Sequence, residues 1–143
     1  MRARKLFAVT IMCWALAPFA SAGPKPAAPE RECPHAYSEF DKIEAEMDKA
    51  ASCTAARELL SACAAGGTSD LRLGGAALAR CERDFLPRLS KAQKRAYQAA
   101  HDRCERRYSR RAGTIYRSAE AFCLVEAAEA YAKRFAKTPQ AKK

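Results

Sequence analysis

The chain has 143 residues, which fits one small domain and leaves no room for a two-domain enzyme. Charged residues make up 29% of the chain and hydrophobic residues 49%, a balance that argues against both a membrane-embedded and a wholly disordered mature protein. The formal net charge is +10, and seven cysteines with only six glycines argue against a glycine-rich β-sandwich. Composition supplies no catalytic signature.

Residues 1–22 have the three parts of a secretory signal peptide. Residues 1–5 are basic, residues 6–20 form an apolar run, and Ala20-Ser21-Ala22 is a small-x-small cleavage site. The apolar run is shorter than the roughly 20 residues of a comfortable membrane span. We therefore expect cleavage after Ala22 and a periplasmic or secreted mature chain without a transmembrane span. An uncleaved N-terminal anchor is the alternative.

The rest of the chain divides by composition into three segments. Residues 23–32 (GPKPAAPERE) contain three prolines and few apolar side chains, which is typical of a flexible linker. Residues 33–136 are expected to form a single helical domain, and residues 137–143 a basic tail that frays.

Hydrophobic side chains recur at helical spacing in the first part of the domain. They are Tyr37, Phe40, Ile43, Met47 and Ala50. The pattern predicts a first helical tract that extends to Cys63 and ends at Gly66-Gly67, where glycine suits a helix terminus. Residues 68–75 are expected to form a loop or a short turn.

A second helical face runs from Leu78 to Tyr108 in steps of three and four residues. Pro87 should kink or split this tract because proline cannot continue a helix. Ser90 with Gln93 resembles a capping box that restarts a helix at this point.

A third tract follows the break at Gly113, with Thr114 as its expected N-cap. It runs from Ile115 to about Lys137 and is rich in alanine. Short connections favour antiparallel neighbours. The sequence therefore predicts an all-α fold, a small antiparallel helical bundle or hairpin that disulfides staple because its core is thin.

Loss of Cys13 with the leader leaves an even number of cysteines, which favours disulfides in an exported chain. The six are Cys33, Cys53, Cys63, Cys81, Cys104 and Cys123. Cys104 and Cys123 flank the Gly113 turn and could meet across a hairpin. Cys63 and Cys81 flank the expected loop in the same way, which leaves Cys33 with Cys53. Many other pairings stay open, since sequence alone does not fix connectivity.

The second half of the domain resembles the lysozyme-inhibitor LprI-like N-terminal domain family of small exported bacterial proteins. The resemblance lies in a helix with Ala-Gln and an aromatic residue, a cysteine that closes this helix, a glycine turn, a small polar residue and a second cysteine. The residues that carry it are Gln93, Tyr97, Asp102, Cys104, Gly113, Ser118 and Cys123. The resemblance implies an exported all-α domain with a Cys104–Cys123 bridge, and lysozyme as a partner in some members.

Two departures from the family pattern weaken what the resemblance implies. Tyr97 stands where the family often has tryptophan, and Asp102-Arg103 reverses the usual Arg-Asp order. Charge adds a further difficulty: without the leader the net charge is +7, and many lysozymes are strongly basic. Inhibition would therefore need an acidic face, around residues 39–46, to address the enzyme.

Charge is distributed unevenly along the domain. Residues 88–117 contain ten basic and two acidic side chains, whereas residues 37–60 contain six acidic and three basic ones. One interpretation is that the two regions neutralise each other within the bundle. The other is a basic surface that binds an anionic envelope polymer or lipid headgroup. This surface would consist of Arg103, Arg106, Arg107, Arg110, Arg111 and Arg117. Export makes nucleic acid an improbable partner.

No nucleophile elbow, phosphate loop or zinc motif occurs in the sequence. His101 and Cys104 share a helical face and could bind zinc with another cysteine, but an oxidising compartment favours the disulfide. Ser118 has no evident base beside it. We therefore expect a non-enzymatic protein with no metal and no cofactor, resembling LprI-like lysozyme inhibitors or, alternatively, binding anionic envelope components.

Overall fold

A computed structural model describes residues 32–136. The expected leader, nearly all of the linker and the basic tail lie outside the described residues. The described part consists of α1 (Phe40–Lys49), α2 (Cys53–Cys63), α3 (Asp70–Phe85), the 3-10 turn η1 (Leu86–Arg88), α4 (Lys91–Tyr108) and α5 (Thr114–Ala136). It contains no strand, so the predicted all-α class is confirmed.

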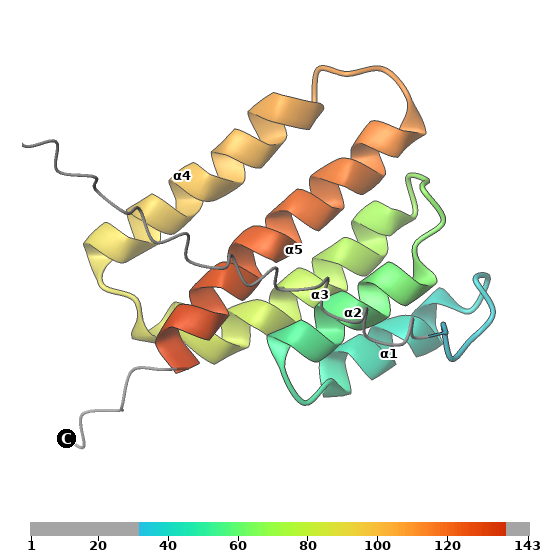
Figure 1. Ribbon diagram of the computed structural model, residues 1–143, viewed down its shortest axis with the longest axis horizontal. Helices are drawn as coiled ribbons and strands as arrows, with labels where there is room; N and C mark the ends of the chain where they lie inside the picture. Colours follow the sequence, from blue (N-terminus) through green and yellow to red (C-terminus); the bar gives the residue numbers. More distant parts are fainter. Residues whose placement is uncertain (1–31, 137–143) are drawn as a thin grey trace, which may run out of the picture.

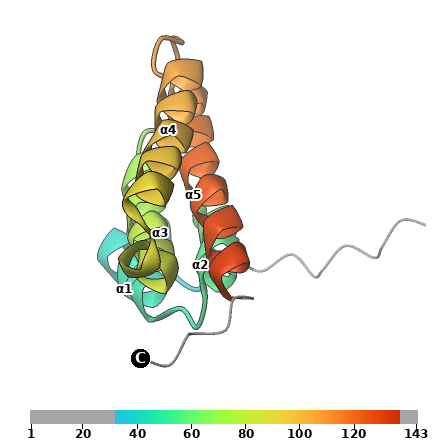
Figure 2. The same cartoon turned by 90° about the vertical axis from the view of Figure 1, so that its left-hand side faces the viewer.

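The helices α3 and α5 form the centre of the bundle (Figure 1). On one side, α1 and α2 pack against α3, and on the other side α4 packs chiefly against α5. Figure 2 looks from the α4 side and shows α4 at the outer edge, in front of the other helices. The α4–α5 pair is therefore a helical hairpin with one helix in the core and one helix on the surface.

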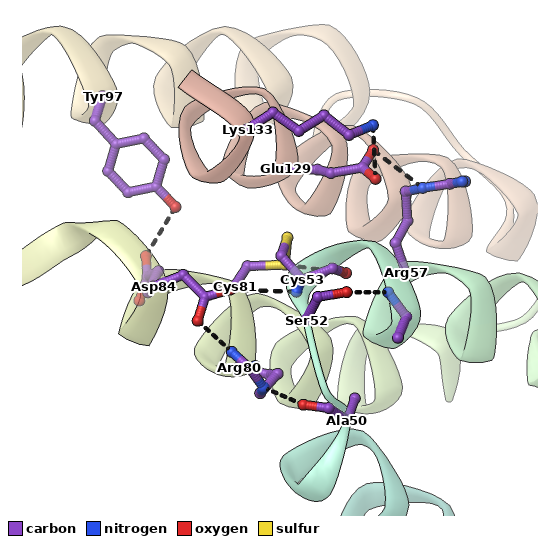
Figure 3. The surroundings of a disulfide bond; sticks show 12 residues. Ala50, Ser52, Cys53, Arg57, Arg80, Cys81, Asp84, Tyr97, Glu129 and Lys133 are labelled. Atoms are coloured by element: carbon purple, nitrogen blue, oxygen red, sulfur yellow. Dashed lines mark hydrogen bonds and ion pairs between the residues drawn. A yellow bond between two sulfur atoms is a disulfide. The ribbon is translucent and has the colours of Figure 1, made fainter. Parts of the chain in front are cut away.

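The first predicted tract is two helices rather than one. Ala50 leaves helical geometry with a ψ of 137°, and Ser52 then caps α2 by accepting the Ala55 N–H at 3.1 Å. Two side chains of α3 hold this break, as Figure 3 shows: Arg80 Nε donates to the Ala50 carbonyl at 2.6 Å, and Asp84 accepts the Cys53 N–H at 3.3 Å. The break thus depends on residues about 30 positions away in the chain.

The loop expected at residues 68–75 is shorter in the structure, because α3 begins at Asp70. The Asp70 carboxylate is completely buried and accepts the N–H groups of Ala65 at 3.1 Å and Gly66 at 2.9 Å. Gly66 has a φ of +75°, the left-handed conformation that glycine adopts without a steric penalty. Asp70 therefore closes the α2–α3 loop from inside, and the helix can start early.

The second tract divides at Pro87 as the sequence predicts. Pro87 lies in η1, and α4 starts after Ser90. The Ser90 hydroxyl accepts the Gln93 N–H at 3.3 Å while the Gln93 side chain accepts the Ser90 N–H at 2.8 Å. The reciprocal bonds confirm the predicted capping box.

Three disulfides join the helices, and the prediction was right for one of them. Cys104–Cys123 ties α4 to α5, as expected. The other two bonds are Cys33–Cys63 and Cys53–Cys81, so the expected pairs Cys63–Cys81 and Cys33–Cys53 are wrong.

The early start of α3 explains the error. Cys81 lies eleven residues after Asp70, about 17 Å along the helix at 1.5 Å per residue. Because α2 and α3 run antiparallel, Cys81 faces the start of α2, where Cys53 lies, rather than its end (Figure 3). Cys63, at the end of α2, is left to bind Cys33.

The contact between α3 and α5 is close because small residues line it. An added Cβ at Gly74 of α3 would lie 2.6 Å from the Ala121 Cβ and 3.3 Å from the Ala121 Cα of α5. Neighbouring Gly75 is exposed, and a Cβ there would meet nothing within 4 Å. Of the two glycines, only Gly74 is needed for packing.

Gly74→Ala should destabilise the fold while Gly75→Ala should stabilise it. We expect Gly74→Ala to lower the free energy of unfolding by about 1–2 kcal/mol, because overpacking outweighs the gain in helix propensity. Gly75→Ala should gain roughly 0.5–1 kcal/mol from helix propensity alone. Urea denaturation of both variants checks this. An equal change in the free energy of unfolding for the two variants would contradict the close contact between α3 and α5.

Candidate functional site

Five of the six predicted basic residues gather at one end of the α4–α5 hairpin. Three lie in the last turns of α4 and two in the turn before α5, and all are exposed. They are Arg103, Arg106, Arg107, Arg110 and Arg111. We name these five the arginine cluster. In Figures 1 and 2, the turn between α4 and α5, which carries Arg110 and Arg111, lies at the end of the hairpin opposite η1.

The arginine cluster makes no ion pair within residues 32–136. Arg107 stacks on the Tyr108 ring at 5.4 Å and Arg111 on the Tyr116 ring at 5.2 Å, measured from guanidinium carbon to ring centroid. Stacking on an aromatic face orients a guanidinium without neutralising its charge. The cluster therefore presents uncompensated positive charge to solvent.

The sixth predicted residue, Arg117, has a different role. Its guanidinium pairs with Glu120 at 2.9 Å on α5 and donates to the Ser109 carbonyl at 2.7 Å. Ser109 lies at the C-terminal end of α4, where backbone carbonyls lack helical partners. Arg117 is held in place and closes the hairpin turn, so we do not count it in the arginine cluster.

Three of the four acidic residues of α1 pair with arginines of α3, not with α4. Arg72 pairs with both Asp41 and Glu44, and Arg83 pairs with Asp48. The interpretation that residues 37–60 and 88–117 neutralise each other is therefore wrong for these three carboxylates. The reason is geometric: α1 packs against α3, whereas α4 lies at the opposite edge of the bundle (Figure 1).

Two adjacent hollows flank the Cys104–Cys123 disulfide. The larger, about 710 Å³, is lined by Arg103, Arg106 and Arg107 of α4 and by Glu126 of α5. The second, about 380 Å³, shares Arg107 and Glu126 and extends to Ile115. Three arginines and one glutamate line the larger hollow, so an anion is the ligand that its charge suits.

The residues that carry the family resemblance mostly serve the fold. Tyr97 is buried, and its hydroxyl donates to the Glu82 Oε1 of α3 at 2.9 Å. Burial, together with this bond, raises the pKa of Tyr97, which keeps the phenol protonated. The ring packs edge-on against Phe85 at 5.0 Å and His101 at 4.4 Å. Tyr97 therefore fastens α4 to α3.

The other motif residues are equally local in their effects. Gln93 completes the capping box, and Asp102 accepts a hydrogen bond from Gln98 at 3.1 Å. Gly113 has a φ of +110°, which the turn between α4 and α5 requires. Ser118 is buried and lines the smaller hollow.

An ionic cluster around the buried Glu129 joins α2 to α5 (Figure 3). Glu129 of α5 pairs with Arg57 of α2 at 3.1 Å and with Lys133 at 2.9 Å. Burial alone would raise the pKa of Glu129, but Lys133, Thr54 and the Arg57 charge lower it below its ordinary value. The carboxylate is charged at neutral pH and holds two helices together.

Metal chemistry and membrane crossing find no support in the part of the chain that the structure describes. Within it, no three His, Cys, Asp or Glu side chains gather as metal ligands would. Cys104 is bonded to Cys123, so the alternative zinc site with His101 is wrong. None of the helices in residues 32–136 combines the length and the apolar character that a bilayer span requires.

Sequence reasoning missed the exposed apolar residues near the arginine cluster. Ile115 is 59% exposed, and Tyr37 and Leu71 are each 39% exposed. These three, which we name the apolar trio, are the exposed large hydrophobic residues of the described chain. Hydrophobic periodicity assigned Tyr37 and Ile115 to helical tracts and Leu71 to a loop, so no local signal marked them as surface.

Comparison with known proteins gives no match: no family model fits the chain, and no curated protein or solved structure is significantly similar to it. The resemblance to LprI-like proteins therefore stays a prediction that rests on the motif residues alone.

Proposed function

We propose that the protein is an exported, non-enzymatic binding protein whose arginine cluster binds a phosphate-bearing component of the cell envelope. Export is supported by the leader-like residues 1–22 and by the three disulfides, because disulfides persist mainly outside the cytosol. The non-enzymatic role is supported by the motif residues, which the fold uses for capping, packing and turns.

The observation that carries the proposal is that the arginine cluster forms no ion pair within residues 32–136. Guanidinium groups bind phosphate through two parallel N–H donors, a geometry that ammonium groups lack. Five exposed arginines within nine residues provide several such donor pairs at one end of the hairpin. Asp102 and Glu105 of α4 and Glu126 of α5 oppose them locally, but five guanidinium groups outnumber these three carboxylates, so the field there is positive.

Inhibition of lysozyme, which the family resemblance implies, stays a prediction with weaker support from the geometry. A basic lysozyme would have to meet an acidic face on α1. Three of the α1 carboxylates, Asp41, Glu44 and Asp48, are already paired with arginines of α3. Unchanged lysis of cell walls by lysozyme at micromolar excess of the oxidised protein would remove this candidate.

Neutralising part of the arginine cluster should weaken binding to inorganic polyphosphate, used as a phosphate-polymer probe. The triple variant Arg103→Gln, Arg106→Gln and Arg110→Gln removes three side chains that form no ion pair or ring contact in residues 32–136. We expect about a hundredfold weaker binding, since each basic residue near a dense anionic surface contributes about 1 kcal/mol. Fluorescence anisotropy at several salt concentrations measures the affinity and its salt dependence.

A charge-matched control is available on the same helix. Lys91, Lys94 and Arg95 are exposed at the other end of α4 and likewise form no ion pair in the described residues. Changing these three to glutamine removes the same charge, and we expect only a small loss of affinity. Equal losses in the two triple variants would show that binding follows net charge, and would contradict a site at the arginine cluster.

A further inference from the structure

The apolar trio lies at the same end of the molecule as the arginine cluster. Ile115 lies in the first turn of α5, and its Cδ1 is 3.4 Å from where a Gly66 Cβ would lie in the α2–α3 loop. Tyr37 hydrogen-bonds Ser69 in this same loop, and Leu71 is in the first turn of α3. Figure 1 shows all three segments at the same end of the bundle as the turn between α4 and α5, with the α2–α3 loop nearer to this turn than the segment before α1.

Exposed aliphatic side chains bordered by arginines and tyrosines are typical of surfaces that bind a lipid interface. Aliphatic groups gain by entering the acyl boundary, and guanidinium groups by contacting headgroup phosphates. Tyr108 and Tyr116, which carry Arg107 and Arg111 on their rings, add the amphipathic aromatic groups that prefer the headgroup level.

We propose that this end of the protein docks on an anionic phospholipid bilayer, with Ile115 and Leu71 entering the interface and the arginine cluster contacting phosphates. The inference rests on the proposed function and names its ligand as lipid rather than soluble polymer. A soluble phosphate polymer offers no apolar region that could bury Ile115 and Leu71. The interface of a bilayer does, and burying these side chains there is favourable.

The acidic residues nearest this end do not oppose docking strongly. Asp41 and Glu44 share Arg72, and Glu39 pairs with Lys42. Arg72 also lies 5.6 Å from the centroid of the Phe40 ring, which holds it beside these carboxylates. Asp102, Glu105, Glu126 and the buried Asp70 also lie at this end, but the five arginines of the cluster outnumber them, so the field at the docking end is positive.

Ile115→Ser tests the inference. Vesicles of phosphatidylglycerol and phosphatidylcholine are floated with the protein, and inorganic polyphosphate is titrated in parallel. We expect vesicle affinity to fall about tenfold or more, which corresponds to losing the burial of one large aliphatic side chain. Polyphosphate affinity should fall by much less, because no charge is altered and the five arginines of the cluster are kept. Folding should be retained, since Ile115 is mostly exposed.

The possible outcomes separate this inference from the proposed function. If Ile115→Ser binds vesicles as tightly as the unchanged protein, the apolar trio does not insert and the inference is wrong, although the arginine site survives. If the unchanged protein binds polyphosphate but no vesicle, the ligand is a soluble polymer and the inference also fails. If it binds neither probe, both proposals fail.

A spectroscopic measurement locates the inserted residue directly. Trp14, the only tryptophan of the chain, lies in the expected leader, so the mature protein would have no intrinsic tryptophan emission. In the variant Ile115→Trp, the tryptophan emission should shift to shorter wavelength when anionic vesicles are added, and brominated lipid should quench it. Ala99→Trp, exposed midway along α4, is the control and should do neither. The same response at both positions would overturn docking through this end.

Discussion

Replacing Cys53 and Cys81 together with alanine is expected to lower the free energy of unfolding by roughly 4 kcal/mol. The two cysteines are 28 residues apart in the sequence. A disulfide that closes a loop of this length lowers the entropy of the unfolded chain, which stabilises the fold by about 3.6 kcal/mol. Both cysteines are also buried in the core, so alanine loses packing as well. Since small domains are stable by only about 5–15 kcal/mol, this change should remove a large part of the total.

Removal of Cys33–Cys63 is the matched comparison for this prediction. That bond spans 30 residues, so its entropic contribution is nearly the same, but Cys33 is only half-buried. Guanidinium denaturation should show the Cys33→Ala/Cys63→Ala variant to be the more stable of the two by about 1 kcal/mol. A native protein in which Cys53 and Cys81 react freely with a thiol reagent would contradict the pairing.

Asp70→Ala is expected to destabilise the protein by about 2–4 kcal/mol, because it leaves two backbone donors without an acceptor. The carboxylate is fully buried and accepts the N–H groups of Ala65 and Gly66, which form the turn between α2 and α3. Urea denaturation gives the change in stability, and hydrogen exchange at these two amides should accelerate.

Asp41→Ala provides a control of the same chemistry on the surface. The Asp41 side chain is 93% exposed although it pairs with Arg72, so its removal should change stability by less than about 1 kcal/mol. If Asp70→Ala were no more harmful than Asp41→Ala, the internal closure of the loop would not contribute to folding as described.

Local signals in the sequence were sufficient for the elements that depend on neighbouring residues. The capping box needs only Ser90 and Gln93, and the break at Pro87 needs only the missing N–H of proline. Likewise, Cys104 and Cys123 flank one short turn, so hairpin geometry brings them together. These features were predicted correctly because sequence separation and spatial separation agree.

Features that depend on distant residues could not be predicted in this way. The break between α1 and α2 is held by Arg80 and Asp84, which hydrophobic periodicity does not reveal. The early start of α3 depends on the burial of Asp70. Because Asp70 is charged, the pattern of apolar residues predicts a loop at this position. Once that start was misplaced, the partner of Cys81 was misplaced with it.

The candidate site also has one part that the sequence reveals and one part that only the fold reveals. The arginine cluster is contiguous in sequence, so it was visible before the fold, although the pairing of Arg117 with Glu120 was not. The apolar trio comes from three separate segments that only the folded chain brings to one end. A binding surface assembled in this way leaves no continuous motif.

Mapping where the phosphate probe contacts the protein tests the proposed anion site directly. In a titration of the isotope-labelled, oxidised protein with polyphosphate, followed by amide NMR shifts, we expect the largest changes at residues 103–117. The amides of α1, three of whose four carboxylates are paired with α3, should move little. Shift changes centred on α1 or on residues 91–95, or no change at all, would contradict an anion site at the arginine cluster.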